Sequence, residues 1–240
     1  MIDVASDVPA GPGVRKVVGL GAGGHAAVLI ELLRAAGGYE VVEVTDPNPE
    51  LQGQEILGVP IRGGDERLTA LRQEGVSAAF VGVGATKSVA PRRRVYERSA
   101  ALGFDLITVV HPTAFVAPSA RLGIGTMVLP GAVVNARARL GDNVTVYSGV
   151  IVEHDTQVGD HTHLSPGVHI AGGVQIGAEC FIGIGASIIQ NVQIGDRVIV
   201  GAGGVVLQDL PADCTAVGIP ARPIGQGRTR PGGTTRWGQE

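Results

Sequence analysis

The sequence predicts a small parallel α/β domain followed by a parallel β-helix, and three observations carry this prediction. From Val116 to Val206 an aliphatic residue occupies every sixth position. Before this region, apolar strand-like runs alternate with amphipathic helical segments. The composition, with 38 glycines and only 3% aromatic residues, suits a narrow, repetitive core better than an ordinary packed one.

The N-terminal segments alternate in the order that builds a parallel sheet. Residues 14–37 predict a buried strand, a glycine-rich turn and an amphipathic helix. The later segments predict, in order, a strand at 39–46, a short extended piece and a helix within 57–75, a strand at 77–84, a helix at 88–103 and a strand at 105–110. Such alternation is typical of a small α/β sheet.

The repeat that follows has the period of a hexapeptide β-helix. Each hexapeptide supplies a short strand and a turn, and three of them complete a coil of 18 residues, so the aliphatic side chains point inward and stack. They are core residues without chemistry: Val116, Leu122, Val128, Val134, Leu140, Val146, Val152, Val158, Leu164, Ile170, Ile176, Ile182, Ile188, Ile194, Val200 and Val206. A glycine column also recurs every 18 residues, where we expect turns with positive φ: Gly123, Gly141, Gly159, Gly177 and Gly195.

These patterns divide the chain into five parts. We expect loose tails at residues 1–13 and 228–240, an α/β domain over 14–110, the β-helix over 111–208, and a C-terminal cap over 209–227. The boundary between the first two domains lies at "HPTAF", where the helical period gives way to the period of six.

The glycine-rich turn of the first domain suggests a phosphate site. Gly19, Gly21 and Gly24 match G-x-G-x-x-G between a strand and a helix, the place where a phosphate binds at a helix N-terminus. A dinucleotide fold needs two such halves, and the roughly 95 residues before the β-helix supply one Rossmann-like half domain. A mononucleotide or a nucleotide sugar is therefore favoured over NAD. The alternative is a strand–helix turn that simply requires glycine.

Other residues near this turn are candidates for the same ligand. Gly23 lies within the turn, and His25 opens the first helix. Asp46 ends the second strand, where it can accept hydrogen bonds from a base or a ribose. The alternative for Asp46 is an exposed loop acid before Pro47.

Composition excludes several functions. A formal net charge of −3 argues against a nucleic-acid-binding surface. Cys180 and Cys214 make no disulfide framework and fit a reducing compartment, so we expect a cytoplasmic protein. No apolar run approaches the roughly 20 residues of a membrane span. The first residues lack the charged start and apolar centre of a secretory signal.

The motif series "GAGGH…HPTA…EHD" resembles a known family. It is similar over about residues 15 to 225 to the hexapeptide-repeat sugar acetyltransferases related to sialic acid O-acetyltransferase and to the N-acetyltransferases of UDP- or GDP-linked 4-amino sugars. This resemblance implies a left-handed β-helix, although crossover rules alone favour the right-handed form. It also implies a homotrimer with sites between subunits, acetyl-CoA as co-substrate without a metal, a 4-amino-4,6-dideoxy sugar nucleotide as substrate, and a role in surface glycan biosynthesis.

Residues 151 to 170 hold the candidate catalytic groups. Acyl transfer to an amine or hydroxyl needs a base, and histidine suits this task. His154 occupies a turn, and Gly172 stacks on it one coil later, which leaves room and a bare N–H for a thioester carbonyl. The resemblance makes His154 the base. Asp155 can orient the imidazole, although Arg137, one coil earlier, competes for it.

The remaining histidines differ in their expected roles. His163 lies nine residues after His154, half a coil away, so the two belong on different sides of one prism and can share a site where neighbouring prisms meet. The resemblance implies that His163 contacts the acetyl carbonyl of acetyl-CoA. We expect His161 to be structural, His169 to point outward without a role, and His111 to end the domain junction.

The segment after the last repeat resembles the coenzyme A cover of the family. Pro220 and Arg222 are candidate contacts, and the arginine can pair with phosphate. Gly201 and Ala202, in the last coil, offer bare backbone to the pantetheine arm. The alternative is a polar cap that closes the open end of the solenoid.

Three other functions stay open. An O-acetyltransferase of a sialic acid or another sugar hydroxyl would use the same base. A zinc lyase like the hexapeptide-repeat carbonic anhydrases would need three ligands on one face, and their pair of histidines five residues apart does not occur here. A purely structural β-helix or binding module would not need the N-terminal domain.

Overall fold

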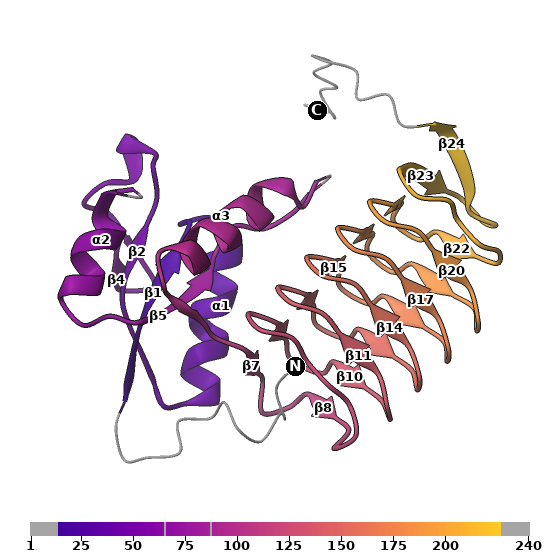
Figure 1. The fold of residues 1–240 in the computed structure, drawn as a ribbon, viewed down its shortest axis with the longest axis horizontal. Coiled ribbons are helices and arrows are strands. Elements are labelled where there is room, and N and C mark those ends of the chain that lie inside the picture. The colour runs from indigo at the N-terminus through magenta and orange to yellow at the C-terminus, as the bar shows by residue number, and fades with distance from the viewer. Residues whose placement is uncertain (1–13, 65, 87, 227–240) are drawn as a thin grey trace.

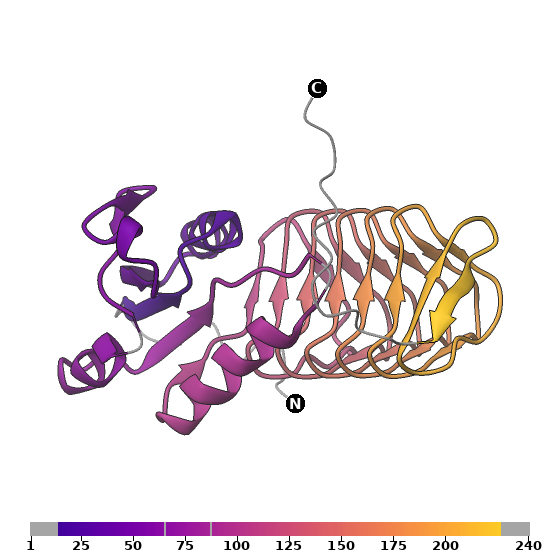
Figure 2. The ribbon, with the colours of Figure 1, turned by 90° about the horizontal axis from the view of Figure 1, so that it is seen from above.

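A computed structural model describes residues 14–64, 66–86 and 88–226. Figure 1 shows an α/β domain beside a long stack of coils, and Figure 2 shows the same stack from above. Predicted and observed architecture agree: a parallel sheet with helices precedes a β-solenoid of about six turns.

The N-terminal sheet has four parallel strands in the order β2-β1-β5-β6. The strands are β1 (Arg15–Leu20), β2 (Tyr39–Thr45), β5 (Ala78–Val81) and β6 (Asp105–Leu106). The helices are α1 (Gly24–Ala36), α2 (Glu66–Gln73) and α3 (Ala90–Ala101), with a short 3₁₀ turn at Pro49–Leu51. Strands β3 (Glu55–Ile56) and β4 (Val59–Pro60) form a small antiparallel pair between β2 and α2.

Alternating side chains divide this sheet into two buried faces, because successive residues of a strand point to opposite sides. Val17 and Phe80 pack with the apolar face of α1 in one cluster. Val18 and Ala79 pack with α2 and α3 in a second cluster on the other face. The small parallel α/β sheet that the sequence predicts is therefore covered by helices on both faces.

The solenoid has three parallel sheets, which share one continuous core. The first contains β7 (Val109–Val110), β9 (Met127–Val128), β12 (Thr145–Val146), β15 (His163–Leu164), β18 (Phe181–Ile182), β21 (Ile199–Val200), β23 (Cys214–Val217) and the antiparallel β24 (Arg222–Gln226). The second contains β8 (Phe115–Val116), β10 (Val133–Val134), β13 (Ile151–Val152), β16 (His169–Ile170), β19 (Ser187–Ile188) and β22 (Val205–Val206). The third contains β11 (Arg139–Leu140), β14 (Gln157–Val158), β17 (Gln175–Ile176) and β20 (Gln193–Ile194).

The predicted aliphatic series lines this core. Every member from Leu122 to Val206 is buried, and Val116 is partly buried against the first coil. Strand pairing places each residue opposite its equivalent 18 positions on, such as Val134 opposite Val152. The solenoid is longer than the series at both ends, because β7 and β23 add strands to the first sheet.

The glycine column has a different physical cause from the one the sequence suggested. None of these five glycines has a positive φ. Instead, a Cβ at Gly159 would lie 2.5 Å from the backbone of Gly177 and Ala178 in the next coil. The glycines are needed because the coils approach too closely for a side chain. The left-handed turn positions fall elsewhere, at Asp155 and His161 among others.

The segment predicted as a fourth strand joins both domains. Its first part, β6, completes the N-terminal sheet, and its second part, β7, pairs with β9 of the solenoid. Val109 also shares a cluster with residues of α1 and with Leu129 of the first coil. On the other side, the Arg93 guanidinium of α3 binds Glu179 Oε1 at 2.7 Å. The two domains are thus packed together through α1, α3 and β7.

Candidate active site

His154 lies in the turn between β13 and β14. Its side chain is 59% exposed, and its Nδ1 atom lies 2.8 Å from Asp155 Oδ2. Asp155 has a φ of 61°, a left-handed conformation that Asp tolerates better than most residues. This contact orients the imidazole so that Nε2 is the free nitrogen, because a carboxylate accepts the hydrogen bond from Nδ1–H.

Asp155 binds Arg137 as well as His154. The Arg137 guanidinium makes two parallel hydrogen bonds to the carboxylate, Nε to Oδ1 at 2.6 Å and NH2 to Oδ2 at 2.7 Å. These bonds, followed by the one from His154, lower the pKa of Asp155 from its ordinary value. The carboxylate therefore stays charged beside the imidazole. Arg137 and His154 bind the Asp155 carboxylate at the same time, so one does not displace the other.

Gly172 faces the free edge of the imidazole. A Cβ at this glycine would lie 2.7 Å from both Cε1 and Nε2 of His154, so no other residue type fits without moving the ring. The Gly172 N–H donates to no acceptor among the described residues. The structure thus places a basic nitrogen and a free backbone donor side by side.

Glu153 and Asn135 also line this turn, although the sequence pattern predicts no role for either. Asn135 Nδ2 donates to Glu153 Oε1 at 3.0 Å, and the His154 N–H reaches Glu153 Oε2 at 3.3 Å. The 18-residue spacing between Asn135 and Glu153 was the available signal.

His163 lies on a different sheet from the His154 turn, as the half-coil spacing predicts. It is only 4% exposed, between the stacked ring of Phe181 and the tilted ring of Tyr147, with ring centroids 5.1 and 5.0 Å away. Burial, reinforced by the charge of Arg92, lowers its pKa to about 4. Its Nδ1 atom has no hydrogen-bond partner among the described residues.

His25 connects the two domains. Its Nδ1 atom lies 2.7 Å from the hydroxyl of Tyr147 on the prism, and its Nε2 atom lies 3.2 Å from NH1 of Arg92 on α3. Arg92 is 1% exposed. Neither Tyr147 nor Arg92 carried a signal in the sequence, because one follows a core position and the other reads as a charge on a helix surface.

The glycine-rich turn is open above the start of α1. A Cβ at Gly21 would meet Val83, and its φ of 100° requires glycine. Gly23 and Gly24 face open space, and their N–H groups have no acceptor among the described residues. A helix start with free N–H groups attracts anions.

Asp46 organises this turn. Its two oxygens accept the backbone N–H groups of Ala22 and Asn48, each at 2.9 Å. It is partly buried. The residue is therefore neither a bare loop acid nor a carboxylate free of partners, and contact with a base or ribose stays a prediction.

The other histidines have local partners or none. His161 Nδ1 lies 3.0 Å from Asn143 Nδ2, and its ring meets Tyr96 of α3 edge-on, which fits a structural role. His111 Nδ1 accepts the N–H of Thr113 at the domain junction. His169 is exposed on β16.

The expected coenzyme contacts lie in the last coil and the cap. The Gly201 N–H donates to Ala216, and its carbonyl accepts from Gly204. A Cβ at Gly201 would meet Val217 of the cap at 2.8 Å, so a side chain does not fit there. Ala202 is exposed, as are Pro220 and Arg222, which begins β24.

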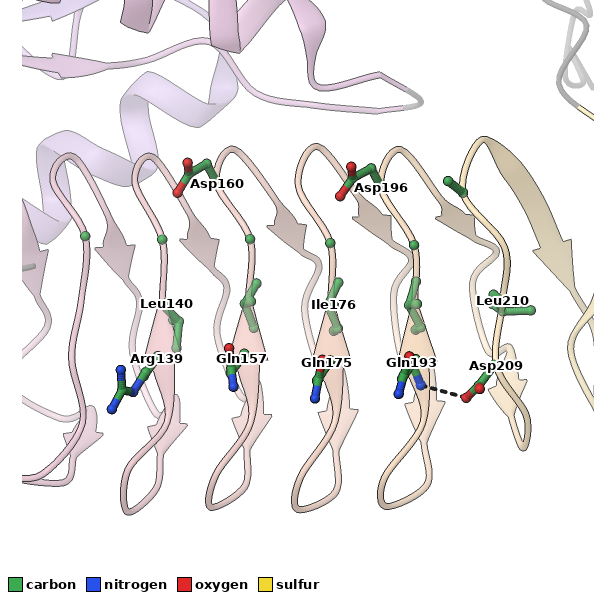
Figure 3. Close-up of a pocket in the computed structure, with 18 of the residues that line it drawn as sticks. Arg139, Leu140, Gln157, Asp160, Gln175, Ile176, Gln193, Asp196, Asp209 and Leu210 are labelled. Carbon is green, nitrogen blue, oxygen red and sulfur yellow. Dashed lines mark hydrogen bonds between the residues drawn. The ribbon is translucent and has the colours of Figure 1, made fainter.

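A groove with a volume of about 1030 Å³ lies along the third sheet. Figure 3 shows the row of Gln157, Gln175 and Gln193 on its floor. Asp160 and Asp196 at its edge accept backbone N–H groups of neighbouring coils at 2.8 Å. Its lining includes no histidine or cysteine, and each of its four aspartates, Asp142, Asp160, Asp196 and Asp209, accepts a backbone N–H group.

The described ranges hold neither a cluster of metal ligands nor a membrane-spanning helix. Over residues 14–64, 66–86 and 88–226, no three His, Cys, Asp or Glu side chains are grouped as metal ligands. In the same ranges, no helix has both the length and the apolar character needed to cross a bilayer.

A hexapeptide prism with an exposed histidine on one turn, joined to a half domain with an open glycine-rich turn, is typical of a hexapeptide-repeat acyltransferase. Family models agree: the PglD N-terminal domain matches residues 16–99, and the bacterial transferase hexapeptide repeat matches 137–172, 155–183 and 173–208. These repeats indicate a left-handed coil. No curated protein matches the sequence significantly.

Two solved structures extend this likeness over nearly the whole chain. Perosamine N-acetyltransferase from Caulobacter crescentus, with a histidine replaced by asparagine and with CoA and GDP-perosamine bound, is 40% identical, with a TM-score of 0.83, over 90% of this chain and all of that one. The acetyltransferase domain of PglB from Neisseria gonorrhoeae, with acetyl coenzyme A, is 39% identical, with a TM-score of 0.82, over 88% and 100%. The chain belongs to this sugar acetyltransferase family and is an acetyltransferase.

Proposed function

We propose that this protein transfers the acetyl group of acetyl-CoA to the amine of a nucleotide-linked 4-amino-4,6-dideoxy sugar, for surface glycan biosynthesis. The observation that carries the proposal is the His154 turn facing Gly172, on a prism packed against a domain with an open glycine turn. Both relatives described above were solved with CoA or acetyl-CoA, and one also with GDP-perosamine. These relatives favour an amine over a hydroxyl acceptor.

In the proposed acetyl transfer, His154, Gly172 and Asp155 each have one role. The sugar amine attacks the thioester carbonyl carbon, and Nε2 of His154 accepts the proton that the amine loses. The carbonyl oxygen becomes an oxyanion, to which the Gly172 N–H donates. Collapse breaks the C–S bond, and the proton passes from His154 to the leaving thiolate. Asp155 stabilises the imidazolium formed in between.

The nucleotide sugar binds with its diphosphate over Gly21, Gly23 and Gly24 and its nucleoside toward Asp46. Free N–H groups at the start of α1 support the phosphate position. The thioester carbonyl contacts His163, whose Nδ1 atom lacks a partner among the described residues. Ala202, Pro220 and Arg222 contact the rest of coenzyme A.

The working unit is a homotrimer with sites between subunits. The outward side chains of the second sheet form a mainly apolar stripe of Phe115, Val133, Ile151, His169, Ser187 and Val205, and Phe115 is 54% exposed. His154 follows β13 of this stripe, so a neighbouring prism packed here would bring a second surface to the imidazole. We place the enzyme in the cytoplasm, where acetyl-CoA and sugar nucleotides are available. A monomeric mass by light scattering at micromolar concentration would contradict the shared site.

The test measures thiol release from acetyl-CoA with UDP- and GDP-linked 4-amino sugars and with free sialic acid. We expect release with an amino-sugar nucleotide, and we expect His154→Ala to lose at least about 100-fold in kcat, the range of general base catalysis. Gln157→Ala is the matched control, because that side chain is exposed on the third sheet, outside the second-sheet stripe. Near-wild-type kcat in His154→Ala would refute the base, and turnover with sialic acid alone would assign an O-acetyltransferase.

A further inference from the structure

A buried hydrogen-bonded series crosses from the N-terminal domain to the prism. Arg92 NH1 lies 3.2 Å from His25 Nε2, and His25 Nδ1 lies 2.7 Å from the Tyr147 hydroxyl. The ring of His163 packs beside Tyr147. The series joins the first turn of α1 to the prism surface that faces it.

The chemistry of these groups fixes the direction of the hydrogen bonds. A guanidinium can only donate, and Arg92 NH1 also donates to the Val81 carbonyl at 2.8 Å. Burial, with the charge of Arg92, lowers the pKa of His25 well below its ordinary value, so the ring is neutral and carries one N–H. Nε2 of His25 therefore accepts from Arg92, and Nδ1–H donates to the oxygen of Tyr147.

This direction leaves the hydroxyl proton of Tyr147 free. Its oxygen accepts from His25, and the hydroxyl has no other hydrogen bond within the described ranges. Burial raises the pKa of Tyr147, so the phenol keeps its proton at neutral pH. A half-buried tyrosine hydroxyl normally finds a partner, and a ligand can supply the missing acceptor.

The position of the hydroxyl indicates which part of a ligand it meets. His25 is the second residue of α1, next to Gly23 and Gly24, whose N–H groups are free and whose faces are open. Arg92 contacts His25 in the first turn of α1, so its guanidinium brings a positive charge to this helix start. Its Nε and NH2 groups are buried without a partner in the part of the chain that is described. An anion at the start of α1 therefore lies within reach of Tyr147 on its prism side.

We propose that the Tyr147 hydroxyl donates a hydrogen bond to the sugar-side phosphate of the nucleotide sugar, and that Arg92 and His25 aim its proton there. Tyr147 is then a substrate-binding residue on the prism, while His25 and Arg92 are positioning residues. The inference rests on the proposed function, because it assumes a nucleoside diphosphate sugar at the glycine-rich turn.

The test compares the binding of nucleoside diphosphates and monophosphates by calorimetry with the full chain. Tyr147→Phe removes only the hydroxyl. We expect its affinity for the nucleoside diphosphate that wild type binds to fall about 10-fold to 100-fold, the range of a hydrogen bond to a charged acceptor. In Tyr147→Phe, the affinity for the matching nucleoside monophosphate should change by less than about two-fold. The KM for acetyl-CoA should also change by less than about two-fold. Tyr96→Phe, at the other domain contact, is the matched control.

A second measurement tests the positioning residues without loss of fold. Nitrogen-15 NMR of labelled histidine should show His25 protonated at Nδ1 and not at Nε2. The opposite tautomer, unchanged diphosphate affinity in Tyr147→Phe, or a loss confined to the complete sugar nucleotide would each overturn the phosphate assignment. Wild-type protein that binds no nucleoside diphosphate would overturn the proposed function itself, which distinguishes the two failures.

Discussion

Gly172→Ala tests whether the space above His154 is needed for catalysis. The new Cβ would lie 2.7 Å from Cε1 and Nε2 of His154, whereas nonbonded carbon atoms normally stay about 3.5 Å apart. The imidazole must therefore retreat by about 0.8 Å while Asp155 holds its Nδ1 atom. A misplacement near 1 Å lowers rates by about 100-fold, which is the loss of kcat that we expect.

Stability should change little in this variant. The His154 side chain is 59% exposed, so the ring can move into solvent without opening the core. Gly172 has no positive φ, and alanine is therefore tolerated by the backbone. We expect the Tm to stay within about 4 °C of wild type.

The assay is thiol release from acetyl-CoA at saturating amino-sugar nucleotide, measured for wild type, Gly172→Ala, His154→Ala and the double variant. If alanine acts by displacing the imidazole, it has no further effect once His154 is absent, so the two losses are strongly non-additive. Fully additive losses, or a kcat of Gly172→Ala within two-fold of wild type, would refute the reasoning.

Two further predictions concern stability. The pKa of His163 is about 4 in the folded protein and about 6.5 in the unfolded chain. Between these two pH values the unfolded chain binds one more proton than the folded protein. The free energy of unfolding should therefore drop by up to about 1.4 kcal/mol per pH unit as the pH falls through this window. Urea titrations from pH 7 to 4 measure this slope, which should be smaller in His163→Gln than in wild type. An equal slope in both proteins would contradict the assignment. Gly159→Ala places a Cβ 2.5 Å from the backbone of the next coil and should lower the free energy of unfolding, measured with urea, by about 1–3 kcal/mol. The control is Gln157→Ala at an exposed position. Equal urea midpoints for the two variants would show that the coils can separate freely.

The sequence predicts the repeat because periodicity reports directly on packing. An aliphatic residue at every sixth position fixes the inward side, and the spacing of 18 then places Gly172 over His154 and Arg137 beside Asp155. These neighbours follow from counting alone, since each coil repeats the geometry of the one before.

Contacts between the domains could not be predicted in this way. Arg92, His25 and Tyr147 come from segments without a shared period, and only the packing of α1 and α3 on the prism joins them. The cause of the glycine column also differs from the sequence prediction. A glycine in a sequence can indicate either a positive φ or a close approach of two backbones. Only the position of the neighbouring coil distinguishes these two causes.

Strand β7 has a consequence for engineering. A solenoid ends in an open row of N–H and C=O groups, which invites pairing with another chain. Here, Val109 and Val110 cover that row on β9, and Val109 shares its apolar contacts with α1. The N-terminal domain therefore supplies the strand that covers the first coil on this sheet. A chimera that exchanges this domain at residue 111 replaces that covering strand as well as the binding module. Grafts that keep the native β7 and the α1 surface that packs on it retain the covered edge of the first sheet.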